Sequence, residues 1–434
     1  MLESITLLSF CAVLLLCILL DISILVALAA GLVIFFIYGL RKKHTLRQLA
    51  EMSASGIKTV KNILITFILI GILTALWRAA GTIPVIICYS VQLMRPSLFL
   101  VMASLLNCIV SFLTGTAFGT AATMGVICAT MGAALQVSPM LTGGAVLSGV
   151  FFGDRCSPVS TSALLTAELT GTNFFDNIKR MLRTALIPLA ATAALYTAIG
   201  CFASHTDEVV DVWSLFGSAF RIHWAALLPA LVILGMSAAR LNVKLAMGGS
   251  ILTAIPLCII LQGESLPSLI RIAVMGYTAQ DPAVAAMLNG GGIVSMLKVA
   301  SIVCLSSAYA GIFRETGLLN GFKQTIRKLS HRITPYGAML CTAVGTSMIA
   351  CNQTLSIMLT HQLCDDLDLK KEELAIYLED TAVIVAPLIP WSIAGAVPLA
   401  SIAAPTSSLL AAFFLYLIPL CQVIAALSRR GKER

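Results

Sequence analysis

Three carboxylates, Asp154, Glu379 and Asp380, stand in stretches of sequence that are otherwise apolar. An acid at the centre of a bilayer costs at least about 2.5 to 3.5 kcal/mol to insert, so an acid kept there is a candidate for function. Its chemistry would be the binding of a cation or of a proton, because one carboxylate cannot hold both together. The structural alternative is an acid that sits near a helix end at the membrane interface. That alternative weighs most for Glu379, because neighbouring residues point to different faces of a helix.

Four polar stretches, rich in Gly, Ser, Thr, Asn and Pro, interrupt the apolar sequence and include all three acids. They are Thr114–Gly125, Gly143–Gly171, Val344–Ser356 and Tyr377–Pro398. In hydrocarbon every backbone polar group must be satisfied, so such stretches are tolerated mainly where the backbone is buried in protein or lines a cavity. A helix broken there exposes carbonyls that can bind a cation and amides that can bind an anion. Close packing of helices through small residues is the structural alternative.

The elements that must position these stretches are expected to be transmembrane helices. Of 434 residues, 59% are hydrophobic and 11% are charged, against roughly 25% charged in an ordinary soluble protein. A helical crossing needs about 20 mainly apolar residues. Ten apolar runs approach that length, the shorter ones with help from their neighbours: Leu7–Leu20, Ile22–Leu40, Ile63–Trp77, Ser97–Leu135, Thr184–Phe202, Trp224–Ala239, Leu245–Leu261, Ile293–Phe313, Tyr336–Leu363 and Ser408–Leu427. We expect an all-α polytopic membrane protein with about 10 to 12 transmembrane segments, including discontinuous helices or re-entrant hairpins.

The charges are distributed as in the loops of a membrane protein rather than on a nucleic-acid-binding face. Of 28 Lys and Arg, 20 lie in five short clusters between apolar runs: Arg41–Lys61, Lys179–Arg183, Arg240–Lys244, Arg314–Arg332 and Arg429–Arg434. Basic loops stay in the cytoplasm, whereas His205–Asp211 is acidic and Asp365–Glu373 is acidic on balance. This predicts that both termini are cytoplasmic, with the first two apolar runs forming a hairpin that turns near Asp21.

An internal repeat is suggested by the order of the polar stretches. Gly115 precedes Pro158 by 43 residues, and Gly345 precedes Pro387 by 42 residues, with an acid shortly before each Pro. Many secondary transporters consist of two repeats of opposite orientation whose discontinuous helices meet at the midplane. We therefore expect one transporter domain over residues 1–434, divided into a first repeat half at 57–190, connecting helices at 191–290 and a second repeat half at 291–428.

Motifs of enzymes, pumps and metal sites are missing from the chain. HExxH, GxxxxGK[ST] and CxxC do not occur, and the 13 Cys mostly lie inside apolar runs, where a free thiol behaves as a small hydrophobe. The run Phe151–Asp154 lacks the first Gly of an intramembrane protease G-x-G-D. We expect neither enzymatic activity nor a resident cofactor, beyond the Na⁺ or H⁺ that would be transported.

The run GAVLSGVFFGDRCSPVSTSALLTAELTG, which ends at Gly171, resembles the signature region of the Na⁺/H⁺ antiporter NhaC family, whose pattern is G-D-K-x-S-P-L-S-D-T-T. The resemblance continues in GILTALWRAAGTIP, TGTAFGT, GGGIVSML and LEDTAVIVAPLIPW, in the family's order over most of the chain. It implies a multi-pass secondary transporter of the bacterial inner membrane that is driven by ion gradients and needs no ATP. Its partners would be the lipid bilayer and a small cation or organic solute, with a homodimer left open.

Carried over residue by residue, the resemblance implies a binding site and two departures from it. The expected ion- or substrate-binding residues are Thr116, Asp154, Ser157, Ser160, Thr161, Lys298, Asn352, Glu379, Asp380 and Ser392, with Asp154 and Asp380 as Na⁺ ligands. Thr161 and Asn352 stand where the family has Asp, so the site has lost two acids. Lys298 is an unexpected charge in an apolar run. It is expected either to neutralise Asp154 or Asp380 in place of Na⁺, or to extend to the lipid headgroups.

Two functions are compatible with these residues. The first is exchange of a monovalent cation for protons, in which an acid alternately binds the cation and the proton. The second is Na⁺- or H⁺-coupled transport of a small organic solute, such as an amino acid or a carboxylate, whose charged groups would meet helix ends and Lys298. The lost acids favour the second function, and the family resemblance favours the first.

Overall fold

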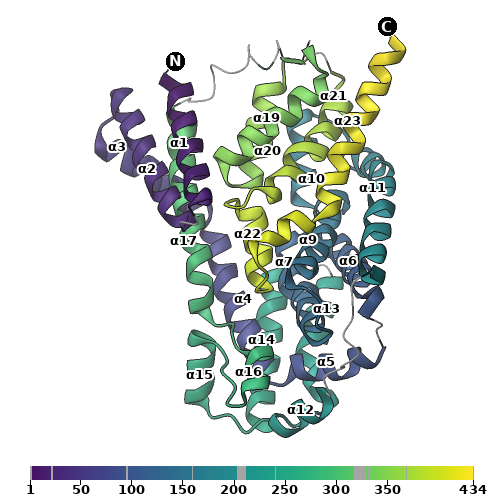
Figure 1. The fold of residues 1–434 in the computed structure, drawn as a ribbon. Helices are drawn as coiled ribbons and strands as arrows, with labels where there is room; N and C mark the ends of the chain where they lie inside the picture. The colour runs from purple at the N-terminus through teal and green to yellow at the C-terminus, as the bar shows by residue number, and fades with distance from the viewer. Residues whose placement is uncertain are drawn as a thin grey trace.

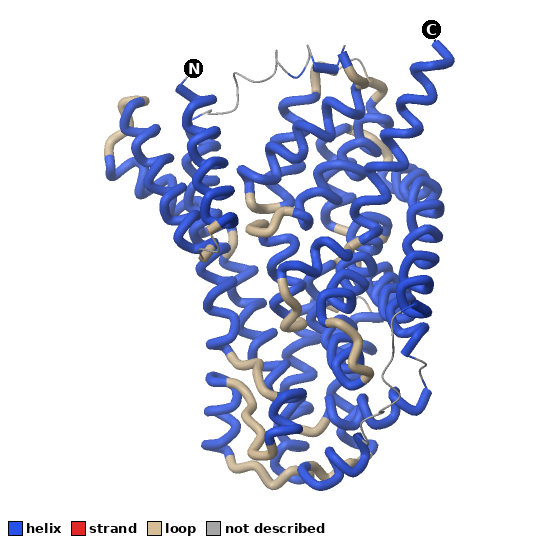
Figure 2. Tube along the Cα trace, in the orientation of Figure 1, coloured by secondary structure: helices blue, strands red, loops and turns tan. Residues whose placement is uncertain are grey.

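The computed structural model describes residues 2–433, apart from 21–22, 94–95, 159, 203–211, 240, 317–325, 327–328, 331 and 368. Its regular structure over these residues is helical (Figure 2), and an isolated bridge joins Tyr277 to Gly290. The helices, in chain order, are α1 Leu2–Leu19, α2 Ile24–Arg41, α3 Leu46–Thr59, α4 Lys61–Ala79, α5 Thr82–Leu93, α6 Pro96–Thr114, α7 Ala117–Thr120, η1 Ala121–Gly125, α8 Val126–Ala134, α9 Pro139–Cys156, α10 Thr161–Thr170, α11 Phe174–Phe202, α12 Val212–Ala219, η2 Trp224–Leu227, α13 Leu228–Ala238, α14 Val243–Ile260, α15 Leu266–Met275, α16 Pro282–Leu288, η3 Ile293–Met296, α17 Leu297–Thr316, α19 Pro335–Ala350, α20 Gln353–Cys364, α21 Lys371–Leu378, η5 Glu379–Val383, η6 Ala386–Leu388, α22 Ile393–Ser401, η7 Thr406–Ala411 and α23 Phe413–Glu433. The expectation of an all-α protein is confirmed.

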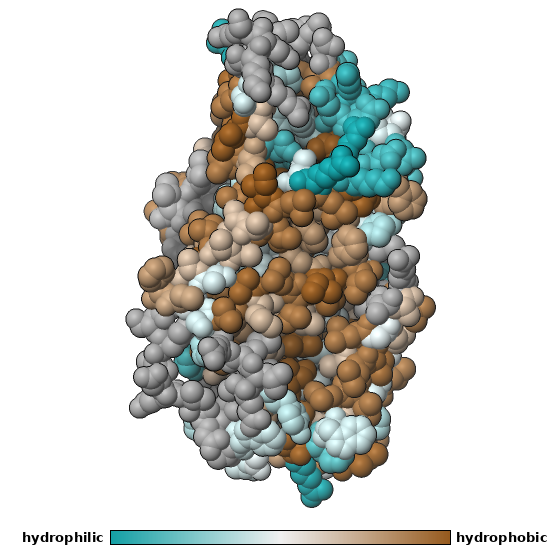
Figure 3. Space-filling view, turned by 90° about the vertical axis from the view of Figure 1, so that its right-hand side faces the viewer, coloured by the Kyte–Doolittle hydropathy of each residue, from teal (hydrophilic) through white to brown (hydrophobic). Residues whose placement is uncertain are grey.

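The surface of the molecule carries large apolar side chains that a water-soluble protein would bury. Leu186, Ile187, Leu252 and Ile270 are between 64% and 72% exposed. Figure 3 shows hydrophobic residues across the middle of one face and hydrophilic residues gathered towards its upper end. Contiguous apolar surface of this extent marks an interaction site, and in a chain of apolar helices the partner is the hydrocarbon of a membrane.

Three of the described helical stretches are long and apolar enough to cross a membrane alone: Pro96–Thr114, Ala117–Ala134 and Phe174–Phe202. Two bent pairs would raise the number to five, namely Leu64–Ala79 with Thr82–Tyr89, bent by 65°, and Lys371–Leu388 with Ile393–Ser401, bent by 56°. Other apolar helices are 10 to 17 residues long. The broken helices are thus present, while the number of 10 to 12 crossings stays a prediction.

The chain begins and ends at the same end of the molecule, with α1 and α23 both reaching the top of Figure 1. This arrangement is the one expected if both termini lie on one side of the membrane. The expected turn near Asp21 and the acidic stretch His205–Asp211 lie outside the described residues. Which side of the membrane holds the termini stays a prediction.

Two helices in the middle of the molecule stop and restart with the same backbone conformation. Between α6 and α7, Gly115 has a φ of +66° and the extended Thr116 caps the new helix. Between α19 and α20, Cys351 has a φ of +52° and the extended Asn352 caps the new helix. A left-handed residue ends each first helix, and a polar N-cap begins each second one.

The break between α19 and α20 lies at Cys351-Asn352, inside the predicted polar stretch Val344–Ser356. Gly345 and Thr346, whose spacing from Pro387 suggested the repeat, lie inside α19, and the Thr346 hydroxyl contacts that of Thr360 at 2.7 Å. The hydroxyl is thus satisfied by the packing of α20 against α19. The predicted stretch therefore contains a break, and its position is not at Gly345-Thr346.

Two further breaks lie at Pro158 and shortly after Pro387, within the predicted polar stretches. α9 and α10 are separated by Ser157–Ser160, and η6 and α22 by Ile389–Ser392. Just before the second of these breaks, Glu379 and Asp380 begin the π-helical turn η5. π-turns inside α-helices are rare and occur frequently at functional sites.

Close packing of α6 against α9 fixes the position of the first acid. A Cβ on Gly149 or Gly153 would collide with the backbone or the side chains of α6. The Ser111 hydroxyl of α6 donates to the Val150 carbonyl at 2.5 Å. Small residues therefore let the two backbones touch one turn before Asp154.

Candidate functional site

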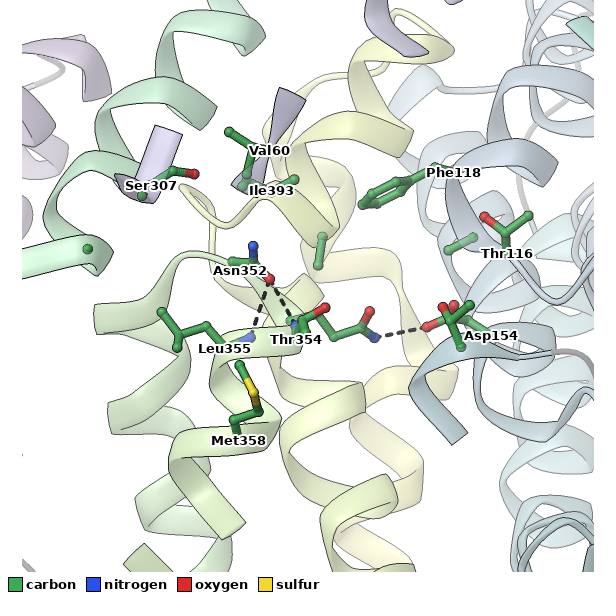
Figure 4. Close-up of a pocket in the computed structure, with 16 residues that line it drawn as sticks. Val60, Thr116, Phe118, Asp154, Ser307, Asn352, Thr354, Leu355, Met358 and Ile393 are labelled. Carbon is green, nitrogen blue, oxygen red and sulfur yellow. Dashed lines mark hydrogen bonds between the residues drawn. The ribbon is translucent and has the colours of Figure 1, made fainter. Parts of the chain in front are cut away.

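Four helices begin at one cavity of about 310 Å³, which we call the Asp154 cavity (Figure 4). The first residues of α7, α10, α20 and α22 all line it: Ala117, Thr161, Gln353 and Ile393. Gly56 of α3, Val60 between α3 and α4, and Ser307 and Gly311 of α17 line it as well. The cavity is therefore built from the four helix breaks that the sequence predicts. Residues of α3 and α17, which lie outside these breaks, complete its lining.

Each of the four helices has an N-cap side chain that accepts a hydrogen bond from the first turn. These side chains are Thr116, Ser160, Asn352 and Ser392. The caps satisfy some of the amides that a helix start leaves without partners. The helix dipoles nevertheless add positive potential to the cavity, since all four point their N-termini at it.

Asp154 is the one carboxylate among the described residues that line the cavity, and it is 6% exposed. Its Oδ2 accepts hydrogen bonds from Gln353 Nε2 at 2.9 Å and from Ser162 Oγ at 3.4 Å. The Ala117 N–H, at the start of α7, also interacts with this carboxylate. Figure 4 shows Asp154 and Asn352 on opposite sides of the view, and the dashed line to Asp154 marks the Gln353 bond. A buried anion is thus held by dipoles and amides, without a paired cation in the described part of the chain.

Gln353 connects the breaks to one another. Its Nε2 donates both to Asp154 and, at 3.1 Å, to the Val383 carbonyl at the end of η5. The start of α22 joins the same network, because the Ile393 N–H donates to the Cys351 carbonyl at 2.8 Å. A shift of α20 would therefore alter the surroundings of Asp154.

Ser157, Ser160 and Ser392 do not line the cavity, although the sequence predicts them as ligands. The Ser157 hydroxyl donates to the Phe112 carbonyl at 2.6 Å, and the Ser160 hydroxyl donates to the carbonyl of Asp154. Ser392 is fully buried at the cap of α22. Of the predicted residues, the cavity brings together Thr116, Asp154, Thr161 and Asn352.

Asp380 is bound to Arg155 in a fully buried ion pair. Arg155 Nη2 also donates to Thr184 Oγ1 at 2.7 Å, and its Nη1 donates to the Met181 carbonyl at 2.9 Å. The guanidinium therefore ties the end of α9 to α11 and to η5. The carboxylate expected to bind Na⁺ has a fixed cation of the chain as its partner.

Glu379 is 1% exposed, and neither of its carboxylate oxygens has a hydrogen-bond partner among the described residues. The neighbouring Thr166 hydroxyl donates its proton to the Ser162 carbonyl at 3.0 Å. An isolated ionised carboxylate is very costly to bury. Glu379 therefore needs a proton or a nearby cation, and it lies outside the lining of the Asp154 cavity.

Lys298 is placed away from the acids. It lines a second cavity together with Arg78, while the cation that pairs with Asp380 is Arg155. The expectation that Lys298 neutralises Asp380 is therefore wrong, and the structure gives it no bond to Asp154.

Two residues of the site were missed by sequence reasoning. Arg155 stands next to Asp154 in the signature run, and a basic residue at membrane depth carries the same signal as an acid. Gln353 follows Asn352, and nothing in its type or spacing distinguishes it from the other polar residues of that break. No group of three or more His, Cys, Asp and Glu residues that could hold a metal ion occurs in the described part of the chain.

Comparison with known proteins gives one family over nearly the whole chain. The model of the Na⁺/H⁺ antiporter family matches residues 2–173 and 149–428. The Na⁺/H⁺ antiporter NhaC of Alkalihalophilus pseudofirmus is 28% identical over 410 residues, covering 92% of this chain and 89% of that protein.

Other relatives at similar identity are named as antiporters of organic solutes. The malate-2H⁺/Na⁺-lactate antiporter of Bacillus subtilis is 27% identical over 388 residues, 86% of this chain and 82% of that protein. The arginine/ornithine antiporter ArcD of Halobacterium salinarum is 28% identical over 378 residues, 83% of this chain and 77% of that protein. The matches extend across both groups of breaks, and the chain therefore belongs to the Na⁺/H⁺ antiporter family.

Proposed function

We propose that this protein is a secondary antiporter that exchanges a monovalent cation for protons at Asp154. The observation that carries the proposal is the position of Asp154, a buried carboxylate in a cavity where four helices begin directly after breaks. The relatives named as Na⁺/H⁺ antiporters support this choice of substrates.

Exchange follows from competition at one carboxylate. A cation bound at Asp154 excludes the proton, and a proton bound there removes the charge that holds the cation. Thr116, Thr161 and Asn352 line the same cavity and are the predicted neutral residues that could complete a cation shell. Arg155 keeps Asp380 out of this competition because its charge is already matched.

Purified protein in proteoliposomes provides the test. With a pH gradient imposed across the vesicle, addition of Na⁺ should dissipate the gradient in the absence of any organic solute. Potassium and choline salts at equal ionic strength are the controls for ion selectivity. If no monovalent cation dissipates the gradient, the antiport proposal fails.

A second candidate is the exchange or coupled transport of a small organic anion. Two observations favour it: four helix N-termini face the Asp154 cavity, and the cavity of about 310 Å³ exceeds the roughly 30 Å³ that one water occupies in the liquid. Helix N-termini are general anion-binding elements. Solute-stimulated flux without Na⁺-driven proton movement would select this candidate over the first.

The architecture behind either function is proposed to be a pair of inverted repeats in the bacterial inner membrane, with both termini in the cytoplasm. The shared backbone conformation at Gly115-Thr116 and Cys351-Asn352 supports equivalent breaks in the two halves. Cysteine labelling from each side of vesicles, at exposed positions near the ends of α1 and α23, would test the orientation.

A further inference from the structure

A second cavity, of about 740 Å³, lies along α22 at positions beyond those that line the Asp154 cavity. Its lining includes Ala396, Leu399 and Ala400 from α22, whereas Ile393 and Ala394 line the Asp154 cavity. The same short broken helix therefore borders both spaces. We call the second space the Arg78 cavity.

Arg78 is half-buried in the last turn of α4, and no carboxylate pairs with it among the described residues. Its Nη1 donates to the Thr74 carbonyl of the same helix at 2.8 Å, and its buried Nε has no hydrogen-bond partner in the described part of the chain. It borders a further cavity of about 220 Å³ as well. A buried charge is normally paired because isolation from water is costly.

Lys298, an exposed residue in the first turn of α17, brings a second cation to the lining of the same cavity. A glycine turn holds the two helices together: the Gly292 N–H donates to the Gly71 carbonyl at 2.8 Å. Gly291 has a φ of +75°, and a Cβ there would lie 2.7 Å from the Ala75 nitrogen. Only glycine allows this approach, so the turn of residues 290–292 fixes Arg78 and Lys298 around one space.

The remaining polar lining of the Arg78 cavity is neutral. It comes from Ser23, Thr74, Asn289, Ser295, Ser401 and Thr406, and no acid lines the cavity among the described residues. The Asn289 carbonyl oxygen accepts from the Ala279 N–H at 2.8 Å, which orients its amide group. Two cations with hydroxyl and amide groups around them, in a space large enough for a solute, are complementary to an oxyanion.

We propose that the Arg78 cavity is an anion-binding site in which Arg78 and Lys298 together bind an oxyanion, the carboxylate of a small solute or the headgroup phosphate of an anionic lipid. This site is distinct from the Asp154 cavity and does not depend on the proposed cation exchange there. Because α22 borders both spaces, an anion held by Arg78 and Lys298 would also touch the helix whose first turn lines the cation site.

The test measures thermal unfolding of the full-length protein in phosphatidylcholine nanodiscs, with succinate and its uncharged diamide as paired probes. Succinate should raise the unfolding temperature with a saturable dependence on concentration, and the diamide should not. Arg78→Met and Lys298→Met should each weaken the apparent affinity by roughly tenfold or more, the size expected for loss of a charge-assisted bond. Arg271→Gln, at an exposed position on α15, is the matched control and should respond to succinate as the wild type does.

The unfolding temperature measured without any anion distinguishes a structural role of Arg78 from a role in anion binding. Removal of a half-buried charge that lacks an ion-pair partner should not lower that temperature, so Arg78→Met should be at least as stable as the wild type while losing the response to succinate. If phosphatidylglycerol nanodiscs stabilise the wild type but neither variant, and succinate has no effect, the oxyanion is a lipid headgroup. Equal responses of the wild type and both variants to every oxyanion overturn the proposal. Na⁺-dependent proton flux is recorded separately without succinate, so failure of the cation exchange would not be mistaken for failure of the anion site.

Discussion

The ion pair between Arg155 and Asp380 predicts that Asp380→Asn damages stability more than ion binding. Arg155 is fully buried, and its other acceptors, Cys156, Met181 and Thr184, are neutral. Removing its ion-pair partner leaves the buried guanidinium without a bonded carboxylate, at a cost of about 3 to 5 kcal/mol. That is a large part of the roughly 5 to 15 kcal/mol that typically stabilises a folded protein.

The double variant Arg155→Met with Asp380→Asn removes both charges and supplies the control. Replacement of a buried ion pair by neutral groups is often neutral or stabilising, so the double variant should recover most of the stability that Asp380→Asn loses. The assay is denaturant-induced unfolding in detergent micelles, followed by tryptophan fluorescence, for the wild type, Asp380→Asn and the double variant. Wild-type stability of Asp380→Asn together with loss of Na⁺ transport would refute this reasoning and restore Asp380 as a transport ligand.

Three further predictions test the packing and polar contacts of the site. Gly153→Ala should lower both stability and transport, because its Cβ would collide with Ser111. Gly345→Ala should be neutral or stabilise the protein by up to about 1 kcal/mol, because the space at that helical position is open. Unfolding curves of the two variants test this comparison. Gln353→Leu should raise the Na⁺ concentration for half-maximal exchange by roughly tenfold, since a bond to a charged group contributes about 1.5 to 3 kcal/mol, and an unchanged value would show that Gln353 does not support Asp154. Glu379→Gln should change the free energy of unfolding by less than about 1 kcal/mol, because neither carboxylate oxygen has a hydrogen bond to lose, and a much larger loss would reveal an ionic partner.

The sequence predicts the kind of site better than it predicts which residues form the site. Acids, glycines and prolines at membrane depth indicated four helix breaks, and the four breaks meet at the Asp154 cavity. The position of the break at Cys351 was missed, because a left-handed Cys carries no local signal, whereas the glycine at 345 does. The sequence does not distinguish the polar side chains at the helix starts from one another. Which of them line the cavity depends on their orientation in the fold.

Charge pairing across the fold could not be predicted from spacing. Arg155 and Asp380 are 225 residues apart, and their contact depends on how α9 packs beside η5. The apolar run around Lys298 suggested a partner among the acids, but the glycine turn at 290–292 directs α17 towards Arg78 instead. In both cases the neighbours of the charged residue are determined by helix packing and not by the local sequence pattern.

The central claim is that one carboxylate serves both ions, and it is tested most directly by measuring sodium and proton movement in Asp154→Asn. Proteoliposomes would report Na⁺/Na⁺ exchange with a radioactive tracer and Na⁺-driven proton flux with a pH-sensitive dye, beside the surface control Asp176→Asn. Both activities should be lost together in Asp154→Asn and kept in Asp176→Asn, whose carboxylate is exposed. Na⁺/Na⁺ exchange or proton flux at the wild-type rate in folded Asp154→Asn would contradict the account.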